Sequence, residues 1–319
     1  MENLLLVSSS PHIRGSNNTR KIMLDVIIAL SPAILASVYF FGIRALVVIL
    51  ITVAACITAE YAARKAMGRE NTISDLSAVV TGILLALNFP VTLPLWIAVA
   101  GGAIAVIIVK QLFGGLGQNF MNPAATARVI LLVSWPAHMT KWVAPGPDAV
   151  SSATPLELVK KGKEAIEGSM PGYFDLFIGN TGGSLGETAD IALLLGAAYL
   201  LYRKVISPVI PVTILGTVAL LTWIFGGDSL FTGDFIYHVF SGGLMLAAFF
   251  MATDYTTSPV TLRGKLIMGV GCGVLTAVIR LYTNYPEGVS FAILLMNIAT
   301  PLIDRYTIPK SFGGEKASA

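Results

Sequence analysis

Residues 114 to 124 combine a glycine-rich stretch with two asparagines, Asn119 and Asn122, immediately before Pro123. Asn before Pro is a helix start by its chemistry, because Asn accepts from free backbone amides and Pro at the first helical position sacrifices no hydrogen bond. A turn followed by a cap explains the segment. A binding site explains it as well, because two side-chain amides beside free helix N–H groups could hold a heterocycle edge or an anion. The spacing leaves both interpretations open.

Single charged residues in or beside apolar segments form a second group of candidates. Asp254 directly follows an uncharged stretch, and Arg128 lies deep in its segment. Such charges are uncommon in apolar segments and often bind ions or ligands. Both are therefore candidate binding residues, although Asp254 also suits an ordinary polar loop. Arg280 and Asp25 lie in apolar segments too, and Asp25 follows Lys21 by one helical turn, which predicts a local ion pair.

A long polar stretch from 137 to 186 holds two further motifs. Composition alone predicts a solvent-exposed turn at 148–156. Residues 182–186 fit the G-x-S-x-G pattern of serine hydrolases, but that pattern joins a strand to a helix, and here an apolar helix follows. We therefore interpret it as a glycine-rich approach to a helix, with Ser184 as a cap and Glu187 in the first turn.

The cysteines and histidines give no local metal or redox motif. Cys56 and Cys272 stand alone in apolar segments, which is typical of small buried hydrophobic residues. The three histidines are scattered, and only His238 lies deep in an apolar segment. We predict no metal ligands, no catalytic side chain and no nucleic-acid partner.

The elements that position these residues must be membrane helices. Only 12% of the 319 residues are charged, against about 25% in soluble proteins, and 55% are hydrophobic. From Leu76 to Val109 there is no Asp, Glu, Lys or Arg. This run exceeds the roughly 20 residues that one bilayer crossing needs. The sequence therefore predicts an all-α protein that crosses the membrane several times and nearly excludes a soluble enzyme.

Apolar windows predict about ten transmembrane helices. They lie near 22–40, 45–61, 75–89, 94–111, 122–136, 187–202, 206–226, 235–252, 266–283 and 289–304. The predicted organisation is a segment at 1–21, a five-helix membrane repeat at 22–136, the polar loop at 137–186, a second five-helix repeat at 187–304, and a tail at 305–319.

Basic residues predict the orientation. With both termini in the cytoplasm, one set of loops carries nearly all of them, as the positive-inside rule requires: Arg14, Arg20, Lys21, Arg64, Lys65, Arg69, Lys110, Arg203, Lys204, Arg263, Lys265, Arg305 and Lys310. The short opposite loops hold only Arg44. Long segments cross largely regardless of charge. The loop at 137–186 is therefore predicted to be extracytoplasmic.

The two halves show a faint internal similarity. Residues 81–90 resemble 241–250, and Asn-Pro-Ala-Ala-Thr at 122–126 has a counterpart at 297–301. Five helices is an odd number, so two such repeats would lie in opposite orientation. Inverted repeats of this kind build substrate or cofactor sites where their helices are broken.

Three ordered segments resemble one membrane family. Asp148 to Thr154 looks like the motif Asp-x-x-Ser/Thr-Gly/Ser-Ala-Thr, whose final Thr receives FMN, and the segments 117–124 and 182–188 resemble further signatures of that family. The family contains the D component of the Rnf complex and the B component of the sodium-pumping NADH:quinone oxidoreductase. The resemblance extends from about Leu24 to Asp304. Ser152 stands where Gly is frequent.

This resemblance implies the cofactors. Thr154 would carry FMN through a phosphoester, and Asp148, Ser151, Ser152 and Ala153 would complete the motif read by a separate flavin transferase. In this arrangement the hydroxyl only anchors the phosphate and leaves the flavin ring free for redox work. Asn119 and Asn122 match a second, non-covalent riboflavin site, to which Arg128 and Asp254 are possible additions. One flavin on each membrane face would make the chain a transmembrane electron carrier.

The resemblance also implies partners. We favour the Rnf branch, because the corresponding quinone-reductase component has an extension before its first helix. Electrons would pass between ferredoxin and NAD through the other Rnf subunits (A, B, C, E and G) in the cell membrane, coupled to movement of Na⁺ or H⁺. Two alternatives stay open: a quinone-reductase component and, without a redox role, a channel or secondary transporter built from broken helices.

Overall fold

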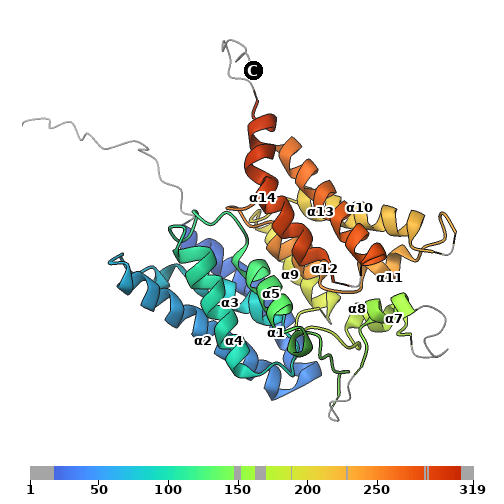
Figure 1. The fold of residues 1–319 in the computed structure, drawn as a ribbon, viewed down its shortest axis with the longest axis horizontal. Helices are drawn as coiled ribbons and strands as arrows, with labels where there is room; N and C mark the ends of the chain where they lie inside the picture. Colours follow the sequence, from blue (N-terminus) through green and yellow to red (C-terminus); the bar gives the residue numbers. More distant parts are fainter. Residues whose placement is uncertain are drawn as a thin grey trace, which may run out of the picture.

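The computed structural model describes residues 18–146, 152–161, 170–187, 189–227, 229–283, 285 and 287–309. These residues form helices and no β-strand (Figure 1). The helices of the first half are α1 (Thr19–Phe41), α2 (Ile43–Ala66), α3 (Ser77–Leu87), α4 (Leu95–Ala103) with its π-helical continuation η2 (Ile104–Gln111), and α5 (Pro123–Ser134). A short 3-10 turn, η1 (Ile73–Asp75), precedes α3.

The polar stretch and the second half follow. The former contains α6 (Pro136–Met139), α7 (Pro155–Lys161) and α8 (Tyr173–Ile178). The latter contains α9 (Asp190–Tyr202), α10 (Val209–Phe225), α11 (Phe235–Val239), α12 (Leu244–Leu246) with the π-helical η4 (Ala247–Met251), α13 (Leu262–Tyr282) and α14 (Val289–Thr307). In Figure 1, α2 to α5 gather on one side and α10, α13 and α14 on the other.

The all-helical, apolar character predicted for a membrane protein is confirmed. Among the described residues, α1, α2 and α13 are long and apolar enough to cross a bilayer. Five other predicted windows hold shorter apolar helices, and the window at 235–252 is divided among α11, α12 and η4. The count of ten crossings and the inverted repeat therefore stay predictions.

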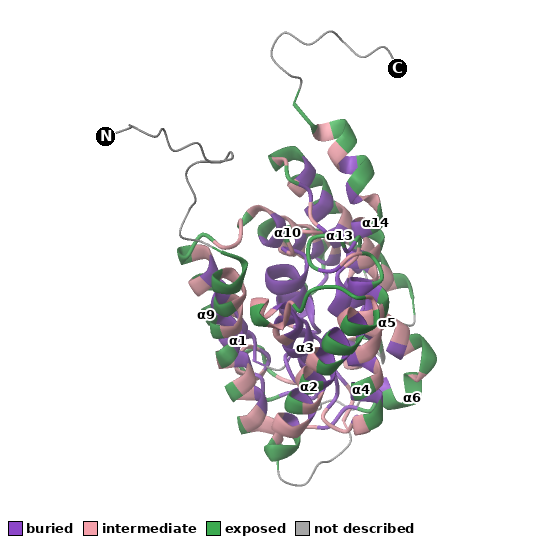
Figure 2. Ribbon diagram, turned by 90° about the vertical axis from the view of Figure 1, so that its left-hand side faces the viewer, coloured by how far each residue is buried: buried purple, intermediate pink, exposed green. Residues whose placement is uncertain are grey.

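One helix break is closed by a distant segment. α3 ends at Leu87, and the amides of Leu185 and Gly186 donate to the carbonyls of Phe89 and Leu87, over 3.0 and 2.7 Å. Buried backbone groups must find such partners. A Cβ on Gly186 would lie 2.6 Å from the Leu87 side chain, so glycine allows this approach. Figure 2 shows α3 almost wholly buried at this centre.

Two local predictions were wrong. Asp25 pairs with Arg203 at the end of α9, over 3.2 Å, and accepts from the Tyr199 hydroxyl over 2.9 Å, instead of pairing with Lys21. This contact fastens α1 to α9. Ser184 does not cap a helix, because α9 begins only at Asp190. Its hydroxyl donates to Glu187 over 2.9 Å within a turn.

Candidate functional site

A cavity of about 270 Å³ opens between the two halves. It brings together three residues that the sequence singled out separately, Asn119, Asn122 and Asp254. Its wall is otherwise mostly apolar, with hydroxyl groups and one cation added: Thr19, Ile22, Met23, Val26, Ser77, Val80, Thr81, Leu84, Lys110, Leu116, Gly117, Pro123, Ala124, Leu200, Val205, Ile206, Phe249, Phe250, Thr253, Tyr255 and Thr256. An apolar cleft with a few convergent polar groups is the usual form of a small-molecule site.

Asn122 is the N-cap that its position before Pro123 predicted. Its side-chain oxygen accepts from the Ala125 amide over 3.1 Å. Its side-chain nitrogen donates to the Met251 carbonyl of η4 over 3.1 Å. Asn122 therefore holds the start of α5 against the end of η4, and so sets the shape of the cavity.

The loop before α5 depends on glycine. Gly114, Gly115 and Gly117 have φ of 125°, 105° and 86°, a region that other residues adopt only with strain. The loop then presents Asn119, which is 5% exposed and donates to the Met121 carbonyl over 3.0 Å. The glycine-rich pattern in the sequence is thus explained by the positive φ that the backbone adopts at these three positions.

Asp254 lies on the loop that follows η4. Burial raises the pKa of its carboxyl above the usual range. Hydrogen bonds from the Thr256 backbone, Thr257 and Asn119 favour the charged form and oppose that rise. The Thr257 hydroxyl lies 3.2 Å from the carboxylate. Asn119 thus lies close enough to Asp254 on the cavity wall to influence the charge state of its carboxyl.

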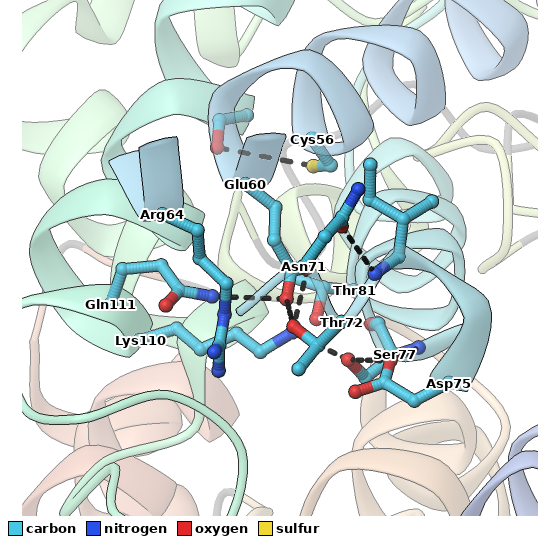
Figure 3. A network of polar contacts seen from close by, with 12 residues as sticks. Cys56, Glu60, Arg64, Asn71, Thr72, Asp75, Ser77, Thr81, Lys110 and Gln111 are labelled. Atoms are coloured by element: carbon cyan, nitrogen blue, oxygen red, sulfur yellow. Dashed lines mark hydrogen bonds and ion pairs between the residues drawn. The ribbon is translucent and has the colours of Figure 1, made fainter. Parts of the chain in front are cut away.

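Sequence reasoning missed a second polar network beside this cavity. Lys110, which the sequence placed in a cytoplasmic loop, lies in η2 and pairs with Glu60 of α2 over 3.0 Å (Figure 3). Its ammonium also donates to the Ser77 hydroxyl over 2.6 Å. Gln111 and Thr72 donate to the other carboxylate oxygen of Glu60 over 3.0 and 2.8 Å. An acidic residue inside the apolar segment 45–61 was the available signal.

Thr154 lies in a different part of the molecule. It is 1% exposed, and its hydroxyl oxygen accepts from the Glu157 amide over 3.2 Å. The Glu157 carboxylate in turn accepts from the Thr154 amide over 3.4 Å. This reciprocal pair is a capping box at the start of α7. Residues 154–156, the described end of the 148–156 stretch, are therefore buried, in contrast to the exposed turn that their composition predicted.

The other residues of the motif from Asp148 to Thr154 divide into two groups. Ser152 and Ala153 are half-buried, and the Ser152 amide donates to the Trp142 carbonyl over 3.2 Å. The Ser152 hydroxyl is buried and has no hydrogen-bond partner among the described residues. A Cβ on Gly182 would lie 2.1 Å from it, so the glycine-rich segment is packed directly on this hydroxyl. Asp148 and Ser151 lie outside the described residues.

Arg128 does not line the cavity. It forms an ion pair with Glu287, and donates to Asn88 over 2.9 Å and to Ser290 over 3.1 Å. Leu156 of α7 packs against Gly242, the break before α12. Arg280 lies against the same glycine. Arg128 is therefore not among the residues that line the cavity with Asn119, Asn122 and Asp254.

α13 connects the two regions. At its start, Thr261 caps it by accepting from the Gly264 amide over 3.0 Å, just after the loop that carries Asp254. At its end, the Thr283 carbonyl accepts from Lys160 of α7, the helix that Thr154 caps. Its 21 residues extend about 30 Å, the thickness of a bilayer's hydrocarbon core. The cavity and Thr154 therefore lie at opposite ends of a helix long enough to cross a membrane.

Comparison with known proteins gives one consistent family. The family described as NQR2, RnfD, RnfE matches residues 6–313. The D component of the Na⁺-translocating ferredoxin:NAD⁺ oxidoreductase complex of Acetobacterium woodii is 50% identical over 98% of this chain and 96% of its own. The D component of the proton-translocating complex of Clostridium ljungdahlii is 46% identical over 98% and 97%. The D component of the Escherichia coli ion-translocating oxidoreductase complex is 38% identical over 97% and 99%.

Proposed function

Because this chain belongs to the NQR2, RnfD, RnfE family, we propose that it is the D component of an ion-translocating ferredoxin:NAD oxidoreductase complex. The relatives that carry this name in full match nearly the whole chain. The chain is then a membrane subunit that passes electrons between ferredoxin and NAD through its partners, coupled to movement of Na⁺ or H⁺. The names of these two relatives specify different translocated ions, Na⁺ in one and H⁺ in the other.

Covalent FMN on Thr154 forms the first half of the proposed electron path. A phosphoester at Thr154 keeps its oxygen as an acceptor for the Glu157 amide, so the capping box does not exclude modification. The Ser152 hydroxyl, which has no partner among the described residues, is two residues away and offers one hydrogen bond. Because Thr154 is 1% exposed, a flavin transferase must act before α7 packs or when it has moved away. We place Asp148 and Ser151 in the segment that this transferase reads.

Riboflavin in the cavity forms the second half. The side chains of Phe249, Phe250 and Tyr255 can cover a flat ring system, and Asn119 and Thr253 can hydrogen-bond its polar edge. Asp254 and Lys110 add one group of each charge to the same wall. The cavity's residues therefore fit a flavin. When bound, such a cofactor supplies the redox chemistry, while the protein sets its position and potential.

The observation that carries the proposal is the position of these two regions at opposite ends of α13. An electron carrier across a membrane needs one cofactor site towards each face. Thr154 and the Asn119 cavity are separated by a helix of about 30 Å, which meets this requirement. A solute transporter would instead have its binding site near the membrane's midplane.

The topology completes the proposal. We place both termini and the cavity in or towards the cytoplasm and residues 137–186 outside, with five-helix repeats at 22–136 and 187–304. The start of α1 at Thr19 lines the cavity, and Asp304 near the end of α14 accepts from the Val260 amide beside it. Both described ends thus lie on the cavity's side. The contacts of α2 with α3 and α4 resemble those of α10 with α11 and α13, which supports an inverted repeat.

The experiment is ferredoxin-dependent NAD reduction in membranes that contain the A, B, C, E and G partners with or without this chain. The proposal predicts activity and ion uptake only when the chain is present. Quinone-dependent oxidation of NADH without ferredoxin-dependent NAD reduction would assign the chain to the other branch of the family. Solute uptake by the isolated chain in vesicles would assign it to transport.

A further inference from the structure

Five ionisable side chains lie buried together beneath α7, apart from the proposed flavin positions. They are two guanidinium groups and three carboxyl groups, each 9% exposed or less: Arg128, Arg280, Glu187, Asp190 and Glu287. Arg280 interacts electrostatically with all three carboxyls, which defines them as one cluster. With every group ionised, the cluster would carry one uncompensated negative charge. Buried charges of this kind are expensive unless they are neutralised.

The helix break at Gly242 and Gly243 lies between the two arginines. A Cβ on Gly242, which has a φ of 74°, would lie 2.9 Å from Arg280. A Cβ on Gly243 would lie 3.4 Å from Arg128. Arg280 donates to the His238 carbonyl and, over 3.0 Å, to the Ser241 carbonyl. The two arginines therefore pack on the backbone at the helix break. Both terminal nitrogens of Arg280 donate to backbone carbonyls there, and not to carboxylates.

Two of the three carboxyls have donors. Glu287 accepts from Arg128 in an ion pair. Glu187 accepts from the Ser184 hydroxyl over 2.9 Å and from its amide over 3.3 Å. These hydrogen bonds support the charge of Glu187. Glu287 is paired through one oxygen only, and its second oxygen has no hydrogen-bond partner among the described residues.

Asp190 differs from both. It is 1% exposed, and neither of its carboxyl oxygens has a hydrogen-bond partner among the described residues. The nearby carboxylate of Glu187 disfavours its charge, which Arg280 favours. A carboxylate without donors in an apolar interior takes up a proton in preference to remaining charged. The same proton removes the cluster's excess charge.

A metal ion is a less suitable occupant than a proton. In the part of the chain that the structure describes, no three His, Cys, Asp or Glu side chains are close enough to hold one. Two other titratable groups face the cluster: Glu157 of α7 acts on Glu287, and His238 of α11 lies beside Arg280. Glu157 adds negative charge beside Glu287, and its effect on Asp190 is therefore indirect.

We propose that Asp190 is a proton-binding carboxyl that is neutral at pH 7 and that releases and regains its proton during ion movement by the complex. The first half of this proposal stands on the cluster alone. The second half rests on the proposed function. The position suits such a role, because Leu156, two residues after Thr154, packs on the same Gly242 that Arg280 contacts.

Infrared spectroscopy tests proton binding directly. The full chain in lipid at pH 7 is expected to show the C=O band of a protonated buried carboxyl. Asp190→Asn should lose this band, whereas Asp190→Glu should keep it at a shifted frequency. The matched control is Glu70→Gln, which removes an exposed carboxyl and should leave the band unchanged. The band's absence in the unmodified chain, its persistence in Asp190→Asn, or its disappearance on addition of NaCl would each overturn the assignment.

The assembled complex tests the second half. In sealed vesicles, Asp190→Asn should lower the number of ions moved per NAD reduced, with the flavin content unchanged. An unchanged ratio would overturn the role in ion movement. If the unmodified complex shows no ferredoxin-dependent NAD reduction, the proposed function fails, while the infrared result still decides whether Asp190 binds a proton. If Asp190→Asn does not fold, the frequency shift of the band in Asp190→Glu remains as the test, and an unshifted band would overturn the assignment.

Discussion

Lys110 and Glu60 form an ion pair of 3.0 Å with side chains 2% and 0% exposed, although 50 residues separate them in sequence. The pair joins η2 to α2, and Gln111, Thr72 and Ser77 saturate it with hydrogen bonds (Figure 3). A fully buried pair of this kind holds the chain in one arrangement. It also fixes the wall of the cavity that Lys110 lines.

Breaking this pair should strongly destabilise the chain. Glu60→Gln leaves the Lys110 ammonium buried without its counter-charge, which costs about 3–5 kcal/mol. Adding Lys110→Met to the same chain should recover much of that loss, because the uncompensated charge is then gone. Thermal unfolding in detergent measures both effects, with the exposed Glu70→Gln as control. If Glu60→Gln alone is as stable as the unmodified chain, the ion pair does not stabilise the fold.

Gly242 should not tolerate a side chain. A methyl group there would lie 2.6 Å from Leu156 and 2.9 Å from Arg280, at a φ of 74°. Overpacking of this kind costs about 1–3 kcal/mol, and the left-handed backbone adds strain. Gly216→Ala is the matched control, because a Cβ at Gly216 of α10 meets nothing within 4 Å. Equal unfolding temperatures for the two variants would contradict this packing.

The sequence predicted the features that depend on near neighbours. Asn122 before Pro123 gave the start of α5, because capping chemistry involves only the next few residues. The glycine loop before it was also predicted from its local pattern. Thr154 was singled out by the family resemblance. Composition alone did not predict that Thr154 is buried, because its segment packs against Trp142, Gly182 and Gly242 from other parts of the chain.

Features that depend on remote partners were not predicted. The one-turn spacing predicts that Asp25 pairs with Lys21, whereas in the structure Asp25 pairs with Arg203 at the end of α9. Arg280 was noticed as a charge in an apolar segment, but Asp190 and Glu187, its neighbours in the buried cluster, were not linked to it. Helix packing decides such pairs, and no spacing rule along one chain contains that information.

Asn122 should be needed for flavin in the cavity as well as for the helix. Asn122→Ala removes a cap worth about 1 kcal/mol and the hydrogen bond to the Met251 carbonyl. We expect less riboflavin in extracts of the purified complex. Thr261→Ala removes a comparable cap from α13 outside the cavity wall. If both variants lose riboflavin equally, general destabilisation explains the result and the specific role of Asn122 is wrong.

Asp254 should make stability depend on pH. Burial raises its pKa in the folded chain, so between the unfolded and the folded value the folded state binds more protons. Its contribution to stability is therefore fully present below the unfolded pKa and is lost as pH rises through the folded pKa. Asp254→Asn should flatten this part of the unfolding-temperature profile. A profile that keeps its slope in Asp254→Asn would assign the effect to another group.

The central claim is that Thr154 carries covalent flavin, and flavin fluorescence in a denaturing gel tests it most directly. The chain is produced together with a flavin transferase, and the unmodified chain should give a fluorescent band. Thr154→Ala should lose that band completely, because the hydroxyl that forms the phosphoester is gone. Thr140→Ala, an exposed threonine on the same polar stretch, should keep it. A dark band from the unmodified chain, or a fluorescent one from Thr154→Ala, would contradict the claim.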